Sequence, residues 1–157
     1  MQVIENSKVK EKLYIEKLEN GLTVMIIPKK GITKKYVMWA THYGSIDNKF
    51  IAPNEKEETS IPDGVAHFLE HKMFEQPNGT NSLDTLTALG VNANAYTSTD
   101  QTCYLFECTD NFIPALDELM GVSNNKQSAR NFSDVLAMMD GLKKEMEKGV
   151  TLQEIIE

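Results

Sequence analysis

Strand-forming and helix-forming runs intermix along this chain, and their order limits the fold more than any other feature of the sequence. The strand runs are rich in aromatic and β-branched residues, whereas the helix runs repeat apolar residues at helical spacing. The predicted strands cover residues 12–18, 22–28, 34–45, 92–98 and 101–108, and the predicted helices cover residues 65–74, 80–90 and 110–121. Because this order is typical of an α+β fold, we predict an antiparallel or mixed sheet packed with helices.

Turn and capping residues mark where several of these elements begin and end. Asn20-Gly21 suits the positive φ angles of a tight hairpin turn between the first two predicted strands. Thr80 or Asn81 is the expected N-cap of the second helix. Residues 46–64 are polar, contain prolines and show no hydrophobic period, so we predict that they form a loop that leads into the first helix.

Composition narrows the class of protein. A chain of 157 residues with 41% hydrophobic content can bury one core, so a single domain or part of one is expected. The net charge of −7 argues against nucleic acid as a partner. The polar opening is unlike a secretory signal and no run is long enough to span a membrane, so we expect no membrane partner. Cys103 and Cys108 cannot pair within one strand, and a reducing cytoplasm fits their use.

A short stretch of the first helix could hold a metal ion. In "GVAHFLEHKMFE", residues 64–75, His67, Glu70 and His71 stand at positions i, i+3 and i+4 and project from one helical face. Two imidazoles placed in this way can bind Zn²⁺, and a carboxylate beside a zinc-bound water can act as general base. The alternative is a surface helix that carries histidines by chance, because a five-residue pattern arises easily.

The residues around this motif extend the pattern well beyond five positions. "PDGVAHFLEHKMFE" and "ALGVNANAYTSTDQTCYLFEC" resemble the pitrilysin/insulinase family of zinc metallopeptidases, the inverted zincins. "LENGLTVMIIPKK" and "THYGSID" resemble the opening strands of that family, in the same order. The resemblance covers residues of about 11–120 and implies an incomplete pitrilysin-family (LuxS/metallohydrolase-like) domain.

The resemblance also implies roles for individual residues. It makes His67 and His71 zinc ligands and Glu70 the general base. Asn94 and Ala95 fall in a strand whose edge holds substrate peptides in the family by main-chain hydrogen bonds. Phe74 matches an aromatic residue that lines the site. Without the resemblance, Asn94 would be interpreted as a turn or edge residue, and Phe74 as a core contact.

The third metal ligand is less clearly marked. Family members carry a glutamate on a later helix, and "EKGVTLQEI", residues 147–155, resembles that segment and nominates Glu154. Glu145 and Glu147 are the alternatives. An acidic amphipathic tail also contains glutamates through composition alone, which leaves the choice among them open.

The end of the chain departs from the family pattern. We predict two regions, residues 1–121 as the N-terminal part of a zinc peptidase domain and residues 122–157 as a divergent helical tail that carries a Met-rich amphipathic helix near 132–148. The resemblance implies that the chain ends before its first domain is complete. We therefore expect that a complementary half, or self-association, takes part in its function.

Two functions follow from these observations. The first is a zinc-dependent metalloendopeptidase that hydrolyses peptides or unfolded segments in the cytoplasm, with Zn²⁺ as cofactor. The second is a non-catalytic zinc-binding or pairing module of the same family. Integrity of the histidine motif favours the first function, whereas the short length of the chain favours the second.

Overall fold

The structure is a computed structural model that describes residues 2–19, 21–52, 55–76 and 78–123. The chain divides into two compact units, Met1–Thr33 and Lys34–Glu157, which are described separately below. Both units are built from antiparallel strand pairs, and all described helices belong to the second unit. This confirms the predicted α+β class.

The first unit is a three-stranded antiparallel sheet in the order β1-β2-β3. Its strands are β1 (Gln2–Asn6), β2 (Glu11–Lys17) and β3 (Thr23–Ile26). The hairpin between β2 and β3 confirms the prediction, and Gly21 has the expected positive φ of 90°. Strand β1 was not predicted, because the apolar pair Val3-Ile4 is flanked by polar and charged residues and shows no strand-like alternation.

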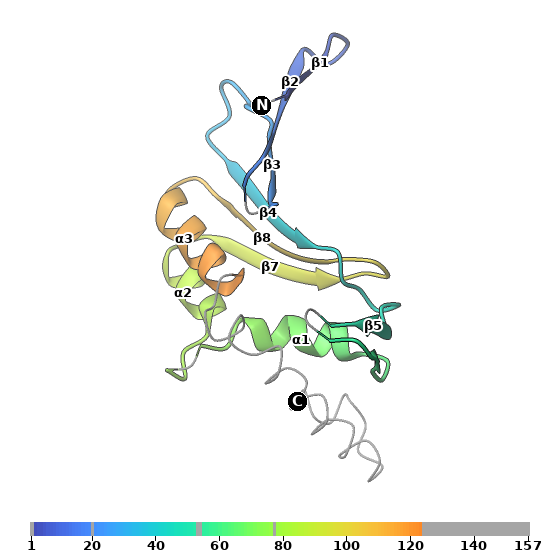
Figure 1. Ribbon diagram of the computed structural model, residues 1–157. Coiled ribbons are helices and arrows are strands. Elements are labelled where there is room, and N and C mark those ends of the chain that lie inside the picture. The colour runs from blue at the N-terminus through green and yellow to red at the C-terminus, as the bar shows by residue number, and fades with distance from the viewer. Residues whose placement is uncertain (1, 20, 53–54, 77, 124–157) are drawn as a thin grey trace. The chain divides into compact units, whose positions relative to one another are not determined.

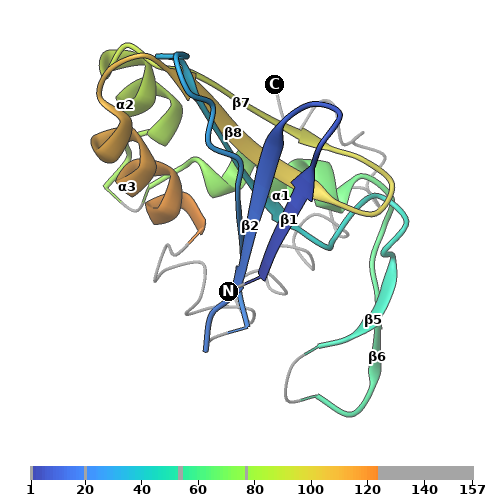
Figure 2. The same ribbon diagram turned by 90° about the horizontal axis from the view of Figure 1, so that it is seen from above.

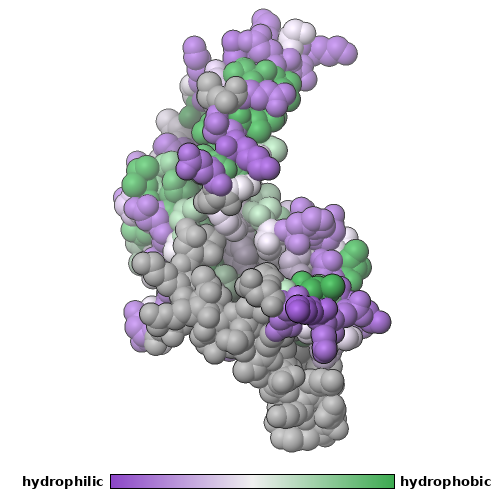
Figure 3. All heavy atoms as spheres, viewed as in Figure 1, coloured by the Kyte–Doolittle hydropathy of each residue, from purple (hydrophilic) through white to green (hydrophobic). Residues whose placement is uncertain are grey.

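Many large apolar side chains of this unit remain exposed. Figure 3 shows hydrophobic side chains among hydrophilic ones over the β1–β3 unit. The exposed set comprises Val3, Ile4, Val9, Leu18, Met25, Ile26, Ile27 and Ile32. Exposed apolar surface of this kind is typical of a face that contacts another protein surface.

The second unit is built on a sheet with the order β4-β8-β7, all antiparallel (Figure 1). Its strands are β4 (Lys35–Thr41), β7 (Asn92–Thr97) and β8 (Thr102–Cys108). They agree with the predicted strands to within a few residues. Strand β8 lies in the middle and is largely buried, whereas β7 forms one edge of the sheet among the described residues.

The predicted loop at 46–64 was partly wrong, because it contains two short strands. These are β5 (Lys49–Ile51) and β6 (Glu58–Ser60), which pair as an antiparallel hairpin that projects from the rest of the unit in Figure 2. Phe50 of β5 packs edge-on against Tyr43, with ring centroids 6.2 Å apart, and borders a small cluster of Ile61 and Val65. This tertiary contact orders a segment whose sequence shows no period.

The described residues of the second unit form three helices, at the predicted positions. They are α1 (Val65–Met73), α2 (Ser82–Ala88) and α3 (Phe112–Ser123). Asn81 is the N-cap of α2, since its side chain accepts a hydrogen bond from the Leu83 amide at 2.8 Å. This resolves the predicted choice between Thr80 and Asn81.

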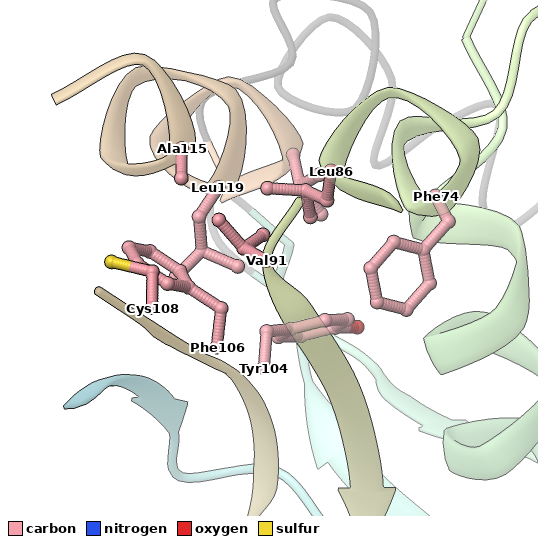
Figure 4. Close-up of a cluster of buried hydrophobic side chains, with 9 residues drawn as sticks. Phe74, Leu86, Val91, Tyr104, Phe106, Cys108, Ala115 and Leu119 are labelled. Atoms are coloured by element: carbon pink, nitrogen blue, oxygen red, sulfur yellow. The ribbon is translucent and has the colours of Figure 1, made fainter. Parts of the chain in front are cut away.

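The core lies between the sheet and these helices (Figure 4). Alternate residues of β8, Tyr104, Phe106 and Cys108, point toward side chains of α2 and α3 such as Leu86 and Leu119. Cys103 lies on the other side of β8, and both cysteines are buried and free. The close packing of this core fixes the position of β7, and therefore of helix α1, which packs against β7.

The predicted helix near 132–148 and almost all of the predicted tail, residues 122–157, lie outside the described residues. The predicted division at residue 121 therefore stays a prediction. Among the described residues, no helix has the length and apolar character that crossing a membrane requires.

Candidate metal centre

Helix α1 carries the candidate ligands and is anchored by its apolar face. The helix starts after Gly64, whose φ of 88° lies in the left-handed region that favours glycine. Val65, Ala66 and Phe68 are buried, and the helix packs against β7 and β8 (Figure 1). Burial of this face fixes the rotation of the helix, and with it the direction of the remaining side chains.

His67, Glu70 and His71 come together on α1, as the sequence predicts. One possible ligand atom from each residue lies within 4.8 Å of the other two. The Nε2 atoms of His67 and His71 are 3.1 Å apart, and both rings are exposed. Glu70, in contrast, is only 7% exposed. The site therefore presents two accessible imidazoles beside a sheltered carboxylate.

This arrangement fits one zinc ion. Two imidazole ligands of one tetrahedral zinc, each about 2.0–2.1 Å from the metal, have nitrogen atoms about 3.3 Å apart. The 3.1 Å between the two Nε2 atoms is close to that separation. Nitrogen lone pairs that face each other at this distance repel unless a proton or a cation lies between them. Imidazole is a preferred zinc ligand, so the donor set also suits the metal.

A residue of the sheet forms a hydrogen bond with the Glu70 carboxylate. Its Oε2 accepts a hydrogen bond of 2.7 Å from the hydroxyl group of Thr97, the last residue of β7. Thr97 lies opposite Thr102 of β8, and the buried Thr102 hydroxyl donates to the Tyr43 carbonyl at 2.8 Å. A short polar chain therefore connects the candidate base to two strands and to the segment after β4.

The charge of Glu70 also affects the pKa of a core residue, Tyr104. Burial raises the pKa of the Tyr104 phenol well above its usual value, and the negative charge of Glu70 raises it further. Tyr104 is 5% exposed, and its ring packs edge-on against Phe74, with centroids 5.4 Å apart. The phenol is therefore neutral beside the carboxylate at ordinary pH.

Asn94 and Ala95 lie on β7, at the edge of the sheet that faces no other described strand. Asn94 is exposed, and its Oδ1 accepts a hydrogen bond of 2.9 Å from the Ala95 amide. That amide therefore takes no part in the pairing with β8, and it belongs to the free edge. An edge of this kind can accept an added strand, so a substrate role for both residues stays a prediction.

Phe74, which the resemblance makes an aromatic residue that lines the site, packs in the hydrophobic core. It follows α1 directly, is 3% exposed, and belongs to the hydrophobic core. Figure 4 shows its ring beside Tyr104. Its position favours the core-contact alternative, and a contact with substrate stays a prediction.

Glu154, Glu145 and Glu147 lie outside the described residues, so the choice of third ligand stays a prediction. His42, the remaining histidine, lies directly after β4, with its Nδ1 atom 2.8 Å from the Asp100 carbonyl oxygen. Among the described residues, only the three residues of α1 form a cluster that could hold a metal ion.

Sequence reasoning missed Thr97, although it lies in the predicted substrate strand, two residues after Ala95. Its alternation with Ala93 and Ala95 on the half-buried side of β7 is visible in the strand pattern. What the pattern cannot show is the partner, since Thr97 and Glu70 are 27 residues apart in the chain.

Comparisons with known proteins identify a family and several relatives of this chain. The family model for insulinase (peptidase family M16) matches residues 55–153. The zinc protease YmfH of Bacillus subtilis is 46% identical over 117 residues, which are 74% of this chain and 27% of that protein. A crystal structure of a putative M16-like peptidase from Alicyclobacillus acidocaldarius matches with a TM-score of 0.67 and 34% identity, over 77% of this chain and 27% of that chain.

The structure of pitrilysin matches with a TM-score of 0.59 and 21% identity, over 77% of this chain and 13% of that chain, which shows a shared fold. The chain spans about a quarter of the length of the first two relatives. The match to the family model includes the whole of α1 and of the β7–β8 hairpin.

Proposed function

We propose that this chain, which belongs to the insulinase family (peptidase family M16), provides the metal-binding helix and the general base of a zinc-dependent metalloendopeptidase. One observation carries the proposal. His67, Glu70 and His71 converge on one face of α1, with two accessible imidazoles beside a sheltered carboxylate. The substrates proposed are peptides or unfolded protein segments.

The residues divide the chemistry between them. Zinc, when bound, supplies Lewis-acid polarisation of the peptide carbonyl and of a water molecule. His67 and His71 hold the metal, and one of Glu154, Glu145 and Glu147 completes the ligand set. Glu70 accepts the proton of the attacking water as general base. Its burial shields the Glu70 carboxylate from bulk water, so that its charge acts more strongly on nearby groups.

The free edge of β7 is the proposed binding place for the substrate backbone. A peptide added there as a further strand gains main-chain hydrogen bonds that do not depend on its sequence. The Ala95 amide, which bonds to the Asn94 side chain, is one donor that such a peptide would engage. Asn94 would then release this amide when substrate arrives.

Glu70→Gln tests the proposed base. The variant keeps both imidazoles and the size of the side chain but cannot accept the proton, so we expect at least a hundredfold loss of peptide hydrolysis with zinc still bound. Turnover of a quenched fluorescent peptide with added zinc measures the first quantity, and metal analysis of the same sample measures the second. The variant and the wild-type chain are assayed side by side, and a complementary half, where one is used, is added to both samples.

Glu75→Gln is the matched control. It makes the same change two residues after α1, where Glu75 forms an exposed ion pair with Lys72 at 2.8 Å. Exposed pairs of this type contribute little to stability, so hydrolysis should stay near the wild-type rate. Equal activity of Glu70→Gln and the wild type would refute the role of Glu70 as base.

A second candidate function is that of a zinc-binding or pairing module that does not hydrolyse peptides by itself. The free edge of β7 favours it, because an unpaired strand binds another chain as readily as a substrate. The partner would be a complementary half of the family type or a second copy of this chain. For either function we propose the cytoplasm as the place of action, where buried free cysteines such as Cys103 and Cys108 are maintained.

A further inference from the structure

Glu70 lies so close to the imidazoles that its role needs a structural explanation. Its carboxylate lies within 4.8 Å of ligand atoms of both histidines. Carboxylate oxygens are ordinary zinc ligands. A third donor atom this close to two imidazoles is able to join them on one zinc ion if its carboxylate can move toward the metal. The proposed function requires a restraint on this carboxylate, because a ligated carboxylate cannot act as a free base.

We propose that the hydroxyl group of Thr97 is the restraint, which keeps Glu70 a proton acceptor and prevents it from becoming a metal ligand. The inference rests on the proposed function. Thr97 Oγ1 donates to Glu70 Oε2 at 2.7 Å, a distance typical of a hydroxyl bound to a charged carboxylate. The bond ties Oε2 to the end of β7 and so restrains the carboxylate from turning or moving toward a metal ion held by the two imidazoles. Thr97 is a positioning residue, since it acts only through Glu70.

Proton accounting supports this direction for the hydrogen bond. A hydroxyl group carries one proton, and an ionised carboxylate can only accept. The proton of Thr102 goes to the Tyr43 carbonyl at 2.8 Å. The Oγ1 atoms of Thr97 and Thr102 are 3.4 Å apart, which is long for a hydrogen bond between hydroxyl groups. Glu70 is therefore the acceptor for the Thr97 proton.

Thr97 lies in the sheet and not in the metal-binding helix, and hydrogen bonds around it fix its position. Thr97 ends β7, and the turn after it is closed by a hydrogen bond of 2.8 Å from the Ser98 amide to the Gln101 carbonyl. The Ser45 amide donates to the Ser98 carbonyl at 2.9 Å. Threonine is also β-branched, so few rotamers are open to it. The sheet can therefore hold Glu70 in place while α1 holds the histidines.

Cobalt substitution tests the proposal without the need for catalysis. Co²⁺ replaces Zn²⁺ in such sites, and its visible absorption weakens when coordination rises from four to five ligands. Thr97→Val removes the hydroxyl group but keeps the shape and branching of the side chain. We expect weaker absorption for this variant than for the wild type, and about tenfold tighter Co²⁺ binding, on the scale typical of changes around the ligand shell.

Thr97→Ser is the matched control, because it keeps the hydroxyl group. It should retain the wild-type spectrum and affinity. The double variant Thr97→Val/Glu70→Gln should also return to the wild-type spectrum, since a neutral amide is a poor ligand. If circular dichroism shows that Thr97→Val does not fold, Thr97→Ala makes the same deletion with a smaller side chain.

The outcomes separate the two proposals. No Co²⁺ binding by the wild-type chain would overturn the proposed function together with the role of Thr97. Binding by the wild type with an unchanged spectrum in the folded deletion variant would overturn the role of Thr97 alone. A Thr97→Ser spectrum like that of Thr97→Val would do the same, because the hydroxyl group would then not be the agent.

Discussion

At the scale of single residues, the site combines groups with opposite exposure. His67 and His71 are open to a metal ion from solvent, whereas Glu70 is sheltered and bonded to Thr97. The carboxylate also acts on Tyr104, whose phenol it helps to keep protonated. The pKa of a core residue is therefore raised mainly by burial and in part by the charge of the candidate base.

Tyr104→Phe should change how stability depends on alkaline pH. The pKa of Tyr104 is raised in the folded state, so its stabilising contribution is complete below the unfolded value of about 10. It is lost as pH rises through the folded value, because only the unfolded chain ionises readily. Between about pH 8 and about pH 11, the wild type should lose more free energy of unfolding than Tyr104→Phe. Denaturant titrations at both pH values measure the difference, and parallel losses would contradict it.

The histidines and Glu70 could be predicted because their spacing alone places them on one helical face. The contribution of Thr97 could not, since its contact with Glu70 depends on how β7 packs against α1. The same applies to Phe74, where the resemblance identifies an aromatic residue but only packing shows that its ring lies in the core.

At the scale of elements, the turn between β7 and β8 is clamped by the segment that follows β4. The Ser45 and Ile46 amides donate to the Ser98 and Thr99 carbonyls at 2.9 and 3.0 Å. Gly44 is buried there, and a β-carbon on it would lie 2.5 Å from the backbone of Thr99 and Asp100. This close approach of two backbones keeps Thr97 beside Glu70.

Gly44→Ala should destabilise the chain by about 1–3 kcal/mol, because the added methyl group meets backbone that cannot move aside cheaply. Gly121→Ala is the control, since Gly121 lies in α3 and a β-carbon added to it would meet no atom of the described residues within 4 Å. That change should stabilise by about 0.5–1 kcal/mol. Urea unfolding followed by fluorescence of Trp39, the single tryptophan, measures both. Equal stability of the two variants would show that the clamp is not tight.

Elements with a clear period or clear end signals were predictable, whereas β1, β5 and β6 were not. Helix α1 and the β7–β8 hairpin show clear periods and clear end signals, so the sequence places them correctly. Strands β5 and β6 have three residues each, too few to show alternation, and they form because Phe50 packs on Tyr43. Strand β1 depends on pairing with β2, including an ion pair between Glu5 and Lys12 across the two strands.

At the scale of the whole molecule, apolar surface and a free strand edge mark places for further protein to bind. The β1–β3 unit exposes large apolar side chains, and β7 has an edge without a described partner. Apolar side chains gain free energy when they leave water, and unpaired main-chain groups gain hydrogen bonds when another strand is added. Both features therefore favour association with a further protein surface.

The chain by itself should therefore self-associate. Exposed apolar residues and unpaired edges favour contacts between copies, so we expect oligomers at micromolar concentration. Size-exclusion chromatography with light scattering measures the mass directly. Ile26→Lys, which places a charge at a residue that is 56% exposed, should shift the population toward the monomer. A wild-type chain that stays monomeric over the whole concentration range would contradict this expectation.

The metal content of the purified chain tests the central claim most directly. We predict about one zinc per wild-type chain and about one per Glu70→Gln chain, because Glu70 is the base and not a ligand. His67→Ala should lose the metal, since one imidazole of α1 cannot hold it with the remaining ligand. Loss of zinc in Glu70→Gln, or full retention in His67→Ala, would contradict the assignment of the two histidines as ligands and of Glu70 as the base.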